Sequence, residues 1–338
     1  MTPGLGSRLT GKLLRQFGSP EGIFRASVTE LEACRLPSAP AHAIQSRQAH
    51  KDAEEELTRI RKLGCLLLNW DEPEYPQRLL EIYDPPPLLY VRGDPSVLNK
   101  HSISMVGTRR PTPYGNQVAE RLGRDLAERG FTIVSGMARG IDSSSHQGAC
   151  RASHGAAVGV LGTGVDVIYP KENRKLFGEV EKRGALISEF PLGSHPAPEN
   201  FPVRNRIVAG ISLGVVVVQG AQYSGSLITA RLGMEFGREV YGIPGNITAE
   251  ELPTEIRAEL FPVEATSRAE RASLFAEALS PQEKNIFVLL GVDEAVHVDE
   301  LVEKSELNSS EVLAALCEME MKGIVRQMPG KQFVKVLL

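Results

Sequence analysis

Two stretches, ISMVGTRRPTPYG at residues 103–115 and SGMARGIDSSSHQGA at residues 135–149, decide the fold of this chain. Short apolar runs at 103–106 and 132–134 each lead into a glycine turn, and apolar residues at helical spacing follow each turn. A strand, a glycine turn and a helix repeated twice indicate right-handed crossovers in a parallel sheet. Asp142 is predicted to cap the second helix. Such turns direct backbone N–H groups and a helix N-terminus at one point, so the pattern predicts an anion site.

Further apolar runs alternate with helical patterns and extend the predicted sheet toward residue 243. The run at 214–218 is apolar on both faces, which is typical of a central strand covered on both sides. Ligands of open α/β sheets bind at the carboxyl ends of the strands, so the loops after these strands form the candidate site. The predicted strands are 66–68, 88–91, 103–106, 132–134, 156–161, 185–187, 214–218 and 239–243.

The segments before and after the sheet have the patterns of separate helical domains. Residues 1–36 predict two or three short helices around a glycine hairpin, residues 37–40 a linker, and residues 49–63 a charged helix. The C-terminal segment predicts three helices and a β-hairpin turning at Pro329 and Gly330, which together describe a winged helix-turn-helix. Its predicted helices are 282–290, 298–305 and 309–322.

Charge and cysteine usage limit the class of partner. The 338 residues carry a net charge of −4, but 101–248 hold 16 Lys/Arg against 12 Asp/Glu, and 249–311 hold 5 against 15. A mildly basic core beside an acidic segment is compatible with nucleic acid bound at one face. The four cysteines form no C-x-x-C pair, and no apolar run approaches the ~20 residues that span a bilayer. We therefore expect a cytoplasmic protein without a membrane partner.

Cations and aromatic residues gather in the loops after the predicted strands. Tyr169 and Phe201 offer base-stacking faces, and Ser224 opens a helix with further hydroxyl and N–H donors. A basic groove with aromatic platforms is what single-stranded nucleic acid requires. The cations in or just after these loops are Arg109, Arg110, Arg139, Lys171, Arg174, Arg204 and Arg206.

The same loops indicate an enzyme less strongly than they indicate nucleic-acid binding. The serines at 143–145 beside His146 are not in a G-x-S-x-G elbow, so His146 is interpreted as a packing residue. The turn VGTRRP is not G-x-G-x-x-G, and no acidic residue follows at the spacing that holds a ribose. The sequence therefore predicts no catalytic residue, no metal site and no cofactor.

The ordered motifs SMVGTRRPTPYG, IVSGMARGIDSSSHQGA, GTGVDVIYPKEN, FPVRNRIVAGIS and VVVVQGAQYSGSLITA resemble the DprA/Smf family of bacterial DNA-processing proteins over about residues 4–248. The resemblance implies an α/β fold: an extended Rossmann-like parallel sheet core, an N-terminal small helical domain of the SAM or helix-hairpin-helix type, and a C-terminal winged helix. The implied division is 1–45 for the N-terminal helical domain, 46–248 for the Rossmann-like DNA-binding domain, 249–281 for an acidic linker and 282–338 for the winged-helix domain.

The resemblance also implies a function and a set of DNA-binding residues. Members of the family bind and protect single-stranded DNA, load the RecA recombinase onto it during natural transformation, form homodimers through the Rossmann-like domain, and are not known as enzymes. Arg109, Lys171 and Arg204 are expected to neutralise phosphates. That Phe201 or Tyr169 stacks a base is inferred from the aromatic residues in the loops and not from the family. The residues that the family motifs imply are Gly107, Arg109, Ser135, Gly136, Lys171, Asn173, Arg204, Asn205 and Ser224. The loop sequences themselves add Arg110, Arg139, Gly162, Gly164 and Phe201 to the predicted DNA-binding residues.

The sequence departs from the family pattern at two places. Gln219 stands where the family usually has a glutamate, and after residues 244–246 (PGN) the serine/glycine-rich stretch of the family is missing. The predicted helix at 309–322 carries Glu311, Glu318 and Glu320, which would repel duplex phosphates, so a protein-contact role is expected for the winged helix.

The alternative reading is a nucleotide phosphoribohydrolase of the lysine decarboxylase-like class, whose P-G-G-x-G-T motif is followed by a glutamate. The comparable strand end here reads QGAQYSGSLITA and lacks that acid. A third reading, a regulator that binds duplex DNA, is disfavoured by the acidic helix.

Overall fold

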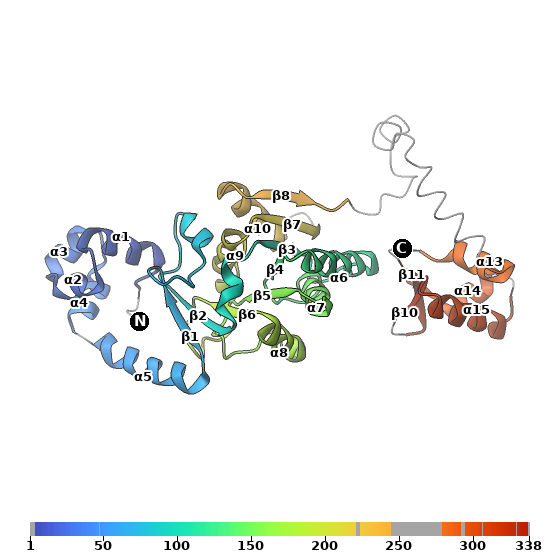
Figure 1. Ribbon diagram of the computed structural model, residues 1–338, viewed down its shortest axis with the longest axis horizontal. Helices are drawn as coiled ribbons and strands as arrows, with labels where there is room; N and C mark the ends of the chain where they lie inside the picture. Colours follow the sequence, from blue (N-terminus) through green and yellow to red (C-terminus); the bar gives the residue numbers. More distant parts are fainter. Residues whose placement is uncertain are drawn as a thin grey trace, which may run out of the picture. The chain divides into compact units, whose positions relative to one another are not determined.

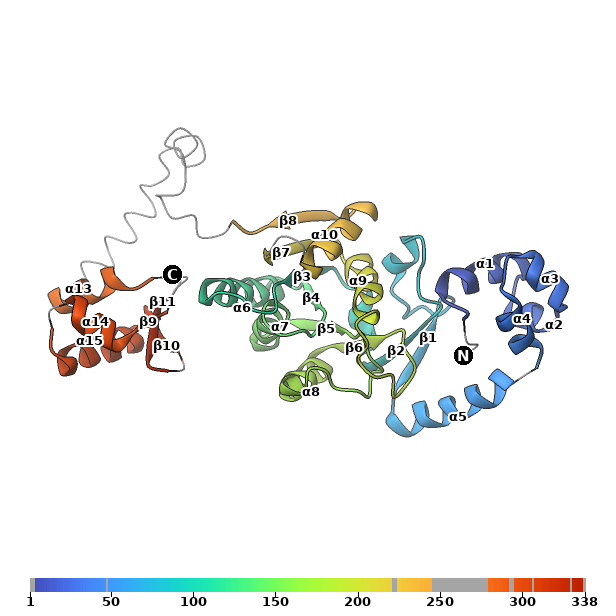
Figure 2. The ribbon, with the colours of Figure 1, turned by 180° about the vertical axis from the view of Figure 1, so that it is seen from behind.

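The computed structural model describes residues 4–46, 48–220, 224–244, 279–291, 295–305, 307–328 and 330–336. The chain divides into two compact units (Figures 1 and 2). One consists of Met1–Arg109 and Ala119–Gly242, and the other of Arg110–Val118 and Ile243–Leu338.

Five helices open the first unit. Gly18 ends the first of them in a left-handed conformation (φ +78°), and its N–H donates to the carbonyl oxygen of Leu14. Ser19 then caps the next helix, because its hydroxyl accepts the N–H of Gly22 at 3.1 Å. The linker predicted at 37–40 is wrong, since a helix begins at Ser38 and carries Pro40 in its first turn, where proline is tolerated. The five helices are α1 (Ser7–Phe17), α2 (Pro20–Arg25), α3 (Val28–Ala33), α4 (Ser38–Gln45) and α5 (Gln48–Leu63).

An eight-stranded sheet forms the centre of the first unit. The strands lie in the order β1-β2-β6-β5-β4-β3-β7-β8. From β6 to β8 all neighbours are parallel, whereas β2 pairs antiparallel with both β1 and β6. The strands are β1 (Leu66–Asn69), β2 (Leu88–Gly93), β3 (Ser102–Gly107), β4 (Thr132–Ser135), β5 (Ala156–Val160), β6 (Ala185–Ser188), β7 (Gly214–Gln219) and β8 (Glu239–Gly242). The predicted α/β class with a parallel core is confirmed.

The strand order reverses between β3 and β7, and this reversal positions the site. The chain moves from β3 through β4 and β5 to β6 on one side, then returns past β3 to β7 and β8 on the other. Loops that leave the carboxyl ends of β3 and β7 therefore diverge and leave a crevice, as in other doubly wound sheets. The helices that connect these strands are α6 (Pro113–Glu128), α7 (Ile141–Arg151), α8 (Arg174–Arg183), α9 (Asn200–Ile211) and α10 (Gly225–Glu235).

The core of the sheet includes residues that precede β2. Tyr75 is fully buried, and its hydroxyl donates to the carbonyl oxygen of Pro86 at 2.7 Å. The indole N–H of Trp70 donates to the same oxygen at 2.8 Å. The interpretation of both aromatic residues as packing residues is confirmed.

The described part of the second unit contains the winged helix. Its helices α13 (Pro281–Leu289), α14 (Val298–Ser305) and α15 (Ser309–Met321) enclose a core with the sheet β10-β11-β9. The strands are β9 (Val296–His297), β10 (Val325–Met328) and β11 (Gln332–Lys335). The predicted linker at 249–281 lies, up to residue 278, outside the described residues, as do Gly245, Asn246 and Pro329. Across the described ranges, no helix combines the length and the apolar character needed to cross a bilayer.

Candidate nucleic-acid interface

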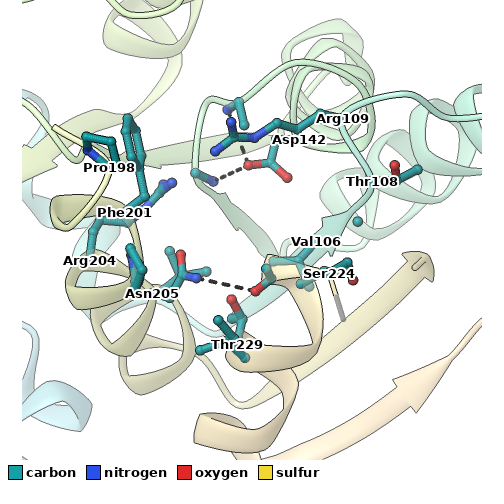
Figure 3. Close-up of a pocket in the computed structure, with 18 of the residues that line it drawn as sticks. Val106, Thr108, Arg109, Asp142, Pro198, Phe201, Arg204, Asn205, Ser224 and Thr229 are labelled. Atoms are coloured by element: carbon teal, nitrogen blue, oxygen red, sulfur yellow. Dashed lines mark hydrogen bonds between the residues drawn. The ribbon is translucent and has the colours of Figure 1, made fainter. Parts of the chain in front are cut away.

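A cavity of about 590 Å³ opens at the carboxyl ends of β3 and β7, where the strand order reverses (Figure 3). Its walls come from the loop after β3, the turn after β4, the first turns of α9 and the N-terminus of α10. A volume of this size is typical of small-molecule sites. The cavity lies at the edge of the sheet where the glycine turns predict an anion site.

Gly107 brings the end of β3 close to its neighbours. A Cβ atom at this position would lie 2.5 Å from Cγ1 of Ile141 and 2.7 Å from the carbonyl oxygen of Gln219. The next N–H, that of Thr108, donates to the same Gln219 oxygen at 2.7 Å. Only glycine lets β3, β7 and α7 converge here, so Arg109 emerges directly at the cavity wall.

The turn after β4 is shaped by the carboxylate of Asp142. Its Oδ2 accepts the N–H groups of Gly136 at 3.1 Å and of Ala138 at 3.2 Å (Figure 3). From the other side, Nδ2 of Asn173 donates to the carbonyl oxygen of Met137 at 2.9 Å, and Met137 has a left-handed φ of +58°. The prediction that Asp142 caps α7 is wrong, because Gly140 occupies the cap position and no side-chain cap bond forms.

Arg204 places a buried positive charge against this turn. The residue is 4% exposed, lines the cavity, and donates from Nη1 to the carbonyl oxygen of Val160. A side chain at Gly136 would overlap its guanidinium group. Burial lowers the pKa of Arg204 to about 10, while the nearby Asp142 carboxylate acts in the opposite direction, so Arg204 stays charged at neutral pH. Its Nε, also buried, has no hydrogen-bond partner among the described residues.

The carboxylate of Asp142 and the imidazole of His146 are buried beside this charge. Burial raises the pKa of the Asp142 carboxyl, although Arg204 and the N–H donors of the turn oppose the increase. Burial lowers the pKa of His146 to about 4, so its ring is neutral at physiological pH. His146 is fully buried, which confirms its interpretation as a packing residue.

An arginine and two aromatic rings form one wall of the cavity. The guanidinium carbon of Arg109 lies 5.6 Å from the ring centroid of Phe201, within the range of a cation–π contact. The rings of Phe201 and Tyr169 are 5.6 Å apart between centroids and tilted by 41°. Tyr169 is 40% exposed, so its ring remains accessible to a ligand.

The N-terminus of α10 completes the cavity. Ser224 occupies the cap position without capping the helix, and its hydroxyl instead lies 2.6 Å from the hydroxyl of Ser226. Nδ2 of Asn205 makes a long contact of 3.4 Å with the carbonyl oxygen of Gly225. No side-chain cap bond forms at this end of α10 among the described residues, so its first backbone N–H groups and its partial positive charge lie at the cavity.

The predicted DNA-binding residues fall into two groups. Gly107, Arg109, Gly136, Phe201, Arg204, Asn205 and Ser224 line the cavity. Arg110, Ser135, Arg139, Gly162, Gly164, Lys171 and Asn173 do not.

The predicted residues that do not line the cavity lie in the sheet, near the turn after β4, in the loop after β5 or in the second unit. Arg110 belongs to the second compact unit, and Ser135 is buried with its hydroxyl donating to the carbonyl oxygen of Met105 at 2.6 Å. Arg139 is exposed and forms an ion pair with Glu172. Lys171 is exposed in the 3₁₀ turn Lys171–Asn173.

The two glycines of the loop after β5 lie behind the cavity wall. A side chain at Gly162 would press on the ring of Phe201, at 2.9 Å from Cδ1. The N–H of Gly164 donates to the carbonyl oxygen of Ser194 at 3.0 Å. Both glycines therefore serve close packing behind the wall.

Sequence reasoning missed the rigid part of the wall. Pro196, Pro198 and Pro202 line the cavity ahead of and within the first turn of α9. Because proline fixes the backbone φ, the three prolines of HPAPENFP could have predicted a loop with a restricted conformation at this place. The apolar side of α10, at Ile228, was also missed.

Comparisons with known proteins identify similar sequences and structures. A family model described as DNA recombination-mediator protein A matches residues 66–258, and one described as the DprA winged helix domain matches 269–331. The chain is 35% identical over 304 residues to protein Smf of Escherichia coli, covering 83% of this chain and 80% of that protein. It is 44% identical over 192 residues to the DNA processing protein DprA of Bacillus subtilis, covering 56% of this chain and 64% of that protein. With another curated relative the match spans about half of the relative's length, 46%.

Two solved structures are also similar. The X-ray structure of DNA processing protein A from Streptococcus pneumoniae matches with a TM-score of 0.65 and 32% identity, over 73% of this chain and 85% of that one. A structure of the Helicobacter pylori DNA processing protein A, solved to describe its single-stranded DNA binding mode, matches with a TM-score of 0.50 and 31% identity. That match covers 54% of this chain and 82% of the other.

Proposed function

Because the chain belongs to the DNA recombination-mediator protein A family, also called DprA or Smf, we propose that it binds single-stranded DNA at the cavity between β3 and β7. The observation that carries this proposal is the convergence of two arginines, an aromatic ring and a helix N-terminus on one cavity. Phosphate suits the arginines and the helix end, and a base suits the ring.

Each part of the cavity has a role in the proposed complex. Arg109 is exposed and neutralises a phosphate, and the base next to it stacks on Phe201 or Tyr169. Arg204 supplies a fixed positive charge at the inner end of the cavity. It is buried, donates a hydrogen bond to the carbonyl oxygen of Val160 and lies near the Asp142 carboxylate. The backbone N–H groups in the first turn of α10, where no side chain caps the helix, and the Ser224 hydroxyl donate to the phosphate oxygens.

Cations outside the cavity fit the neighbouring nucleotides of a polymer. Lys171 and Arg174 are exposed at the start of α8, next to the turn that Asn173 holds. Arg139, paired with Glu172, lies on the same turn. We propose that these side chains neutralise phosphates on either side of the nucleotide in the cavity, which extends the site along a strand.

The serine-rich start of α7 supports binding without catalysis. The hydroxyl of Ser143 donates to the carbonyl oxygen of Ala138 at 2.7 Å, and His146 is fully buried. Neither group is arranged to attack a substrate in the cavity. We propose that the protein acts by binding DNA and is not an enzyme.

The remaining parts of the proposal rest on family membership. We propose that the protein protects single-stranded DNA in the cytoplasm, loads RecA onto it during natural transformation and recombination, and forms a homodimer through its Rossmann-like domain. We further propose the division into domains at 1–45, 46–248, 249–281 and 282–338. Glu318 and Glu320 are exposed on α15 and disfavour duplex binding, so the winged helix is proposed to contact protein.

The full-length protein tests the proposal directly. Fluorescence anisotropy with labelled oligo-dT should show binding that weakens as salt increases, and excess duplex should compete poorly. In parallel, nucleoside monophosphates incubated with the protein should release no free base. Release of base without binding of oligo-dT would overturn the proposal in favour of a phosphoribohydrolase.

A further inference from the structure

A buried cluster of charges lies behind the cavity wall. Arg206 follows Arg204 by two positions on α9, so the two side chains leave nearly opposite faces of the helix. Nη1 and Nη2 of Arg206 lie 2.6 and 2.7 Å from the two carboxylate oxygens of Glu189, and Nε lies 3.1 Å from Oδ2 of Asp84. The three side chains are only 6%, 10% and 19% exposed.

The N–H donors of Arg206 are all used within the protein. Besides the three bonds to carboxylates, Nη1 donates to the carbonyl oxygen of Val203 at 3.3 Å and Nη2 to the hydroxyl of Ser7 at 3.2 Å. A guanidinium group has five N–H donors, so none remains for a phosphate. Although it lies in the same motif as Arg204, Arg206 is therefore not part of the DNA contact.

The cluster joins the two ends of the segment that forms one wall of the cavity. Glu189 directly follows β6, and the chain from there to Arg206 contains the proline loop and the first turns of α9. This segment supplies Phe201 and Arg204 to the cavity. The paired contact between Glu189 and Arg206 ties the two ends of the segment together, and Asp84 attaches them to the chain ahead of β2.

The cluster also reaches the N-terminal helices. Ser7 is the first residue of α1, and its hydroxyl donates to Oε2 of Glu189 at 3.3 Å while accepting from Arg206. Ser7 does not line the cavity. A buried ion pair contributes little net stability compared with apolar packing, whereas the two parallel bonds between Arg206 and Glu189 restrict the relative orientation of the groups that they join.

We infer that Arg206 is a positioning residue for strand binding: its contacts to Glu189, Asp84 and Ser7 hold the wall that carries Phe201 and Arg204, and they couple this wall to α1. This inference rests on the proposed function. It assigns the N-terminal helices a part in DNA affinity without contact to the strand.

The test replaces Arg206 by lysine in the full-length protein. Arg206→Lys keeps the charge but loses the planar fork, so an effect on binding reports geometry and not attraction. The matched control is Arg92→Lys, because Arg92 makes the same two-bond contact with Glu181, at 3.0 and 2.8 Å, away from the cavity. Ser7→Ala removes only the link to α1.

Oligo-dT affinity at several salt concentrations and hydrogen exchange over residues 190–205 are the two measurements. Arg206→Lys should weaken binding about tenfold with an unchanged salt slope and speed up exchange in that segment. Ser7→Ala should weaken binding by about two- to threefold, and Arg92→Lys should match the wild type. If Arg206→Lys does not fold, Ser7→Ala decides, and wild-type affinity of that variant overturns the coupling.

Other results would also overturn the inference. Wild-type affinity of Arg206→Lys would show that the cluster does not position the wall, and a slope lowered by ~0.7 would make Arg206 a phosphate contact. An equal loss in Arg92→Lys would indicate general destabilisation. If the wild type itself does not bind oligo-dT, the proposed function fails. The positioning role is then tested by hydrogen exchange alone, and an unchanged exchange rate over residues 190–205 in Arg206→Lys overturns it.

Discussion

The guanidinium carbon of Arg109 lies 5.6 Å from the ring centroid of Phe201, so one contact joins a group suited to phosphate with a group suited to a base. The two residues come from segments far apart in the chain, the loop after β3 and the start of α9. In a single strand the sugar links each phosphate to its base and keeps the two within a limited range of distances. In the proposed complex, this paired cation and ring therefore bind one nucleotide unit of a strand without reading the identity of its base.

Replacing Arg109 by alanine should weaken binding to every single-stranded sequence. Each phosphate contact contributes about 0.7 to the salt slope of a single strand, so Arg109→Ala should lower the slope by ~0.7. Anisotropy titrations at several salt concentrations measure this. Arg151→Ala is the control, because Arg151 is an exposed arginine that pairs with Glu120 outside the cavity. An unchanged slope in Arg109→Ala would remove Arg109 from the phosphate contacts.

Replacing Phe201 by alanine should weaken binding without a change in the salt slope. Stacking of a base on an aromatic ring contributes about 1–3 kcal/mol by alanine substitution, and Phe201→Ala should cost an amount in this range. Phe201→Trp should retain most of the affinity, since any flat ring stacks. The same titration with an abasic strand should show little difference between wild type and Phe201→Ala. A large difference there would mean that Phe201 supports the wall and does not stack a base.

The strand and turn pattern could be predicted from the sequence because it is local. Every predicted strand lies within two residues of an observed one, and the glycine turns lead to Gly107 and Gly136 at the cavity as expected. Apolar periodicity and glycine positions depend on neighbouring residues along the chain. The location of the site at the strand ends follows from the order of strands and helices.

The direction of each side chain could not be predicted, because it depends on contacts between distant residues. Arg204 and Arg206 look equivalent in the motif FPVRNR, yet one faces the cavity and the other is saturated by Glu189, Asp84 and Ser7. Asp142 looks like a helix cap but binds the N–H groups of a turn. These differences arise from tertiary pairing, which no local pattern contains.

Gly136→Ala should reduce strand binding while the fold persists. A Cβ at Gly136 would overlap the guanidinium group of Arg204, so the buried charge has to move from its place below the cavity. We expect a loss of about tenfold or more in oligo-dT affinity, since a shift of about an ångström at a preorganised group has effects of this size. Gly178→Ala is the matched control, because it lies in α8 with nothing within 4 Å of the added atom. Equal affinity of the two variants would mean that Arg204 does not contribute.

Acid should destabilise the protein through His146. The pKa of this buried ring is about 4 in the folded protein and near 6.5 when unfolded, so the unfolded chain takes up a proton first as the pH falls. The stability that His146 contributes is therefore complete above about pH 6.5 and is lost as the pH falls from there through about 4. The shift corresponds to about 3 kcal/mol.

Urea unfolding at a series of pH values measures this effect in the wild type and in His146→Leu, which has no titrating group at the position. Arg204 adds to the depression of the His146 pKa, whereas the raised pKa of the buried Asp142 has the opposite effect on stability, because the folded protein then takes up the proton first. Asp142 and Arg204 are present in both proteins, so the difference between the two curves isolates His146. We expect the wild type to lose stability more steeply between pH 6.5 and 4. Parallel curves would show that the His146 ring is protonated as easily in the folded protein as in the unfolded chain.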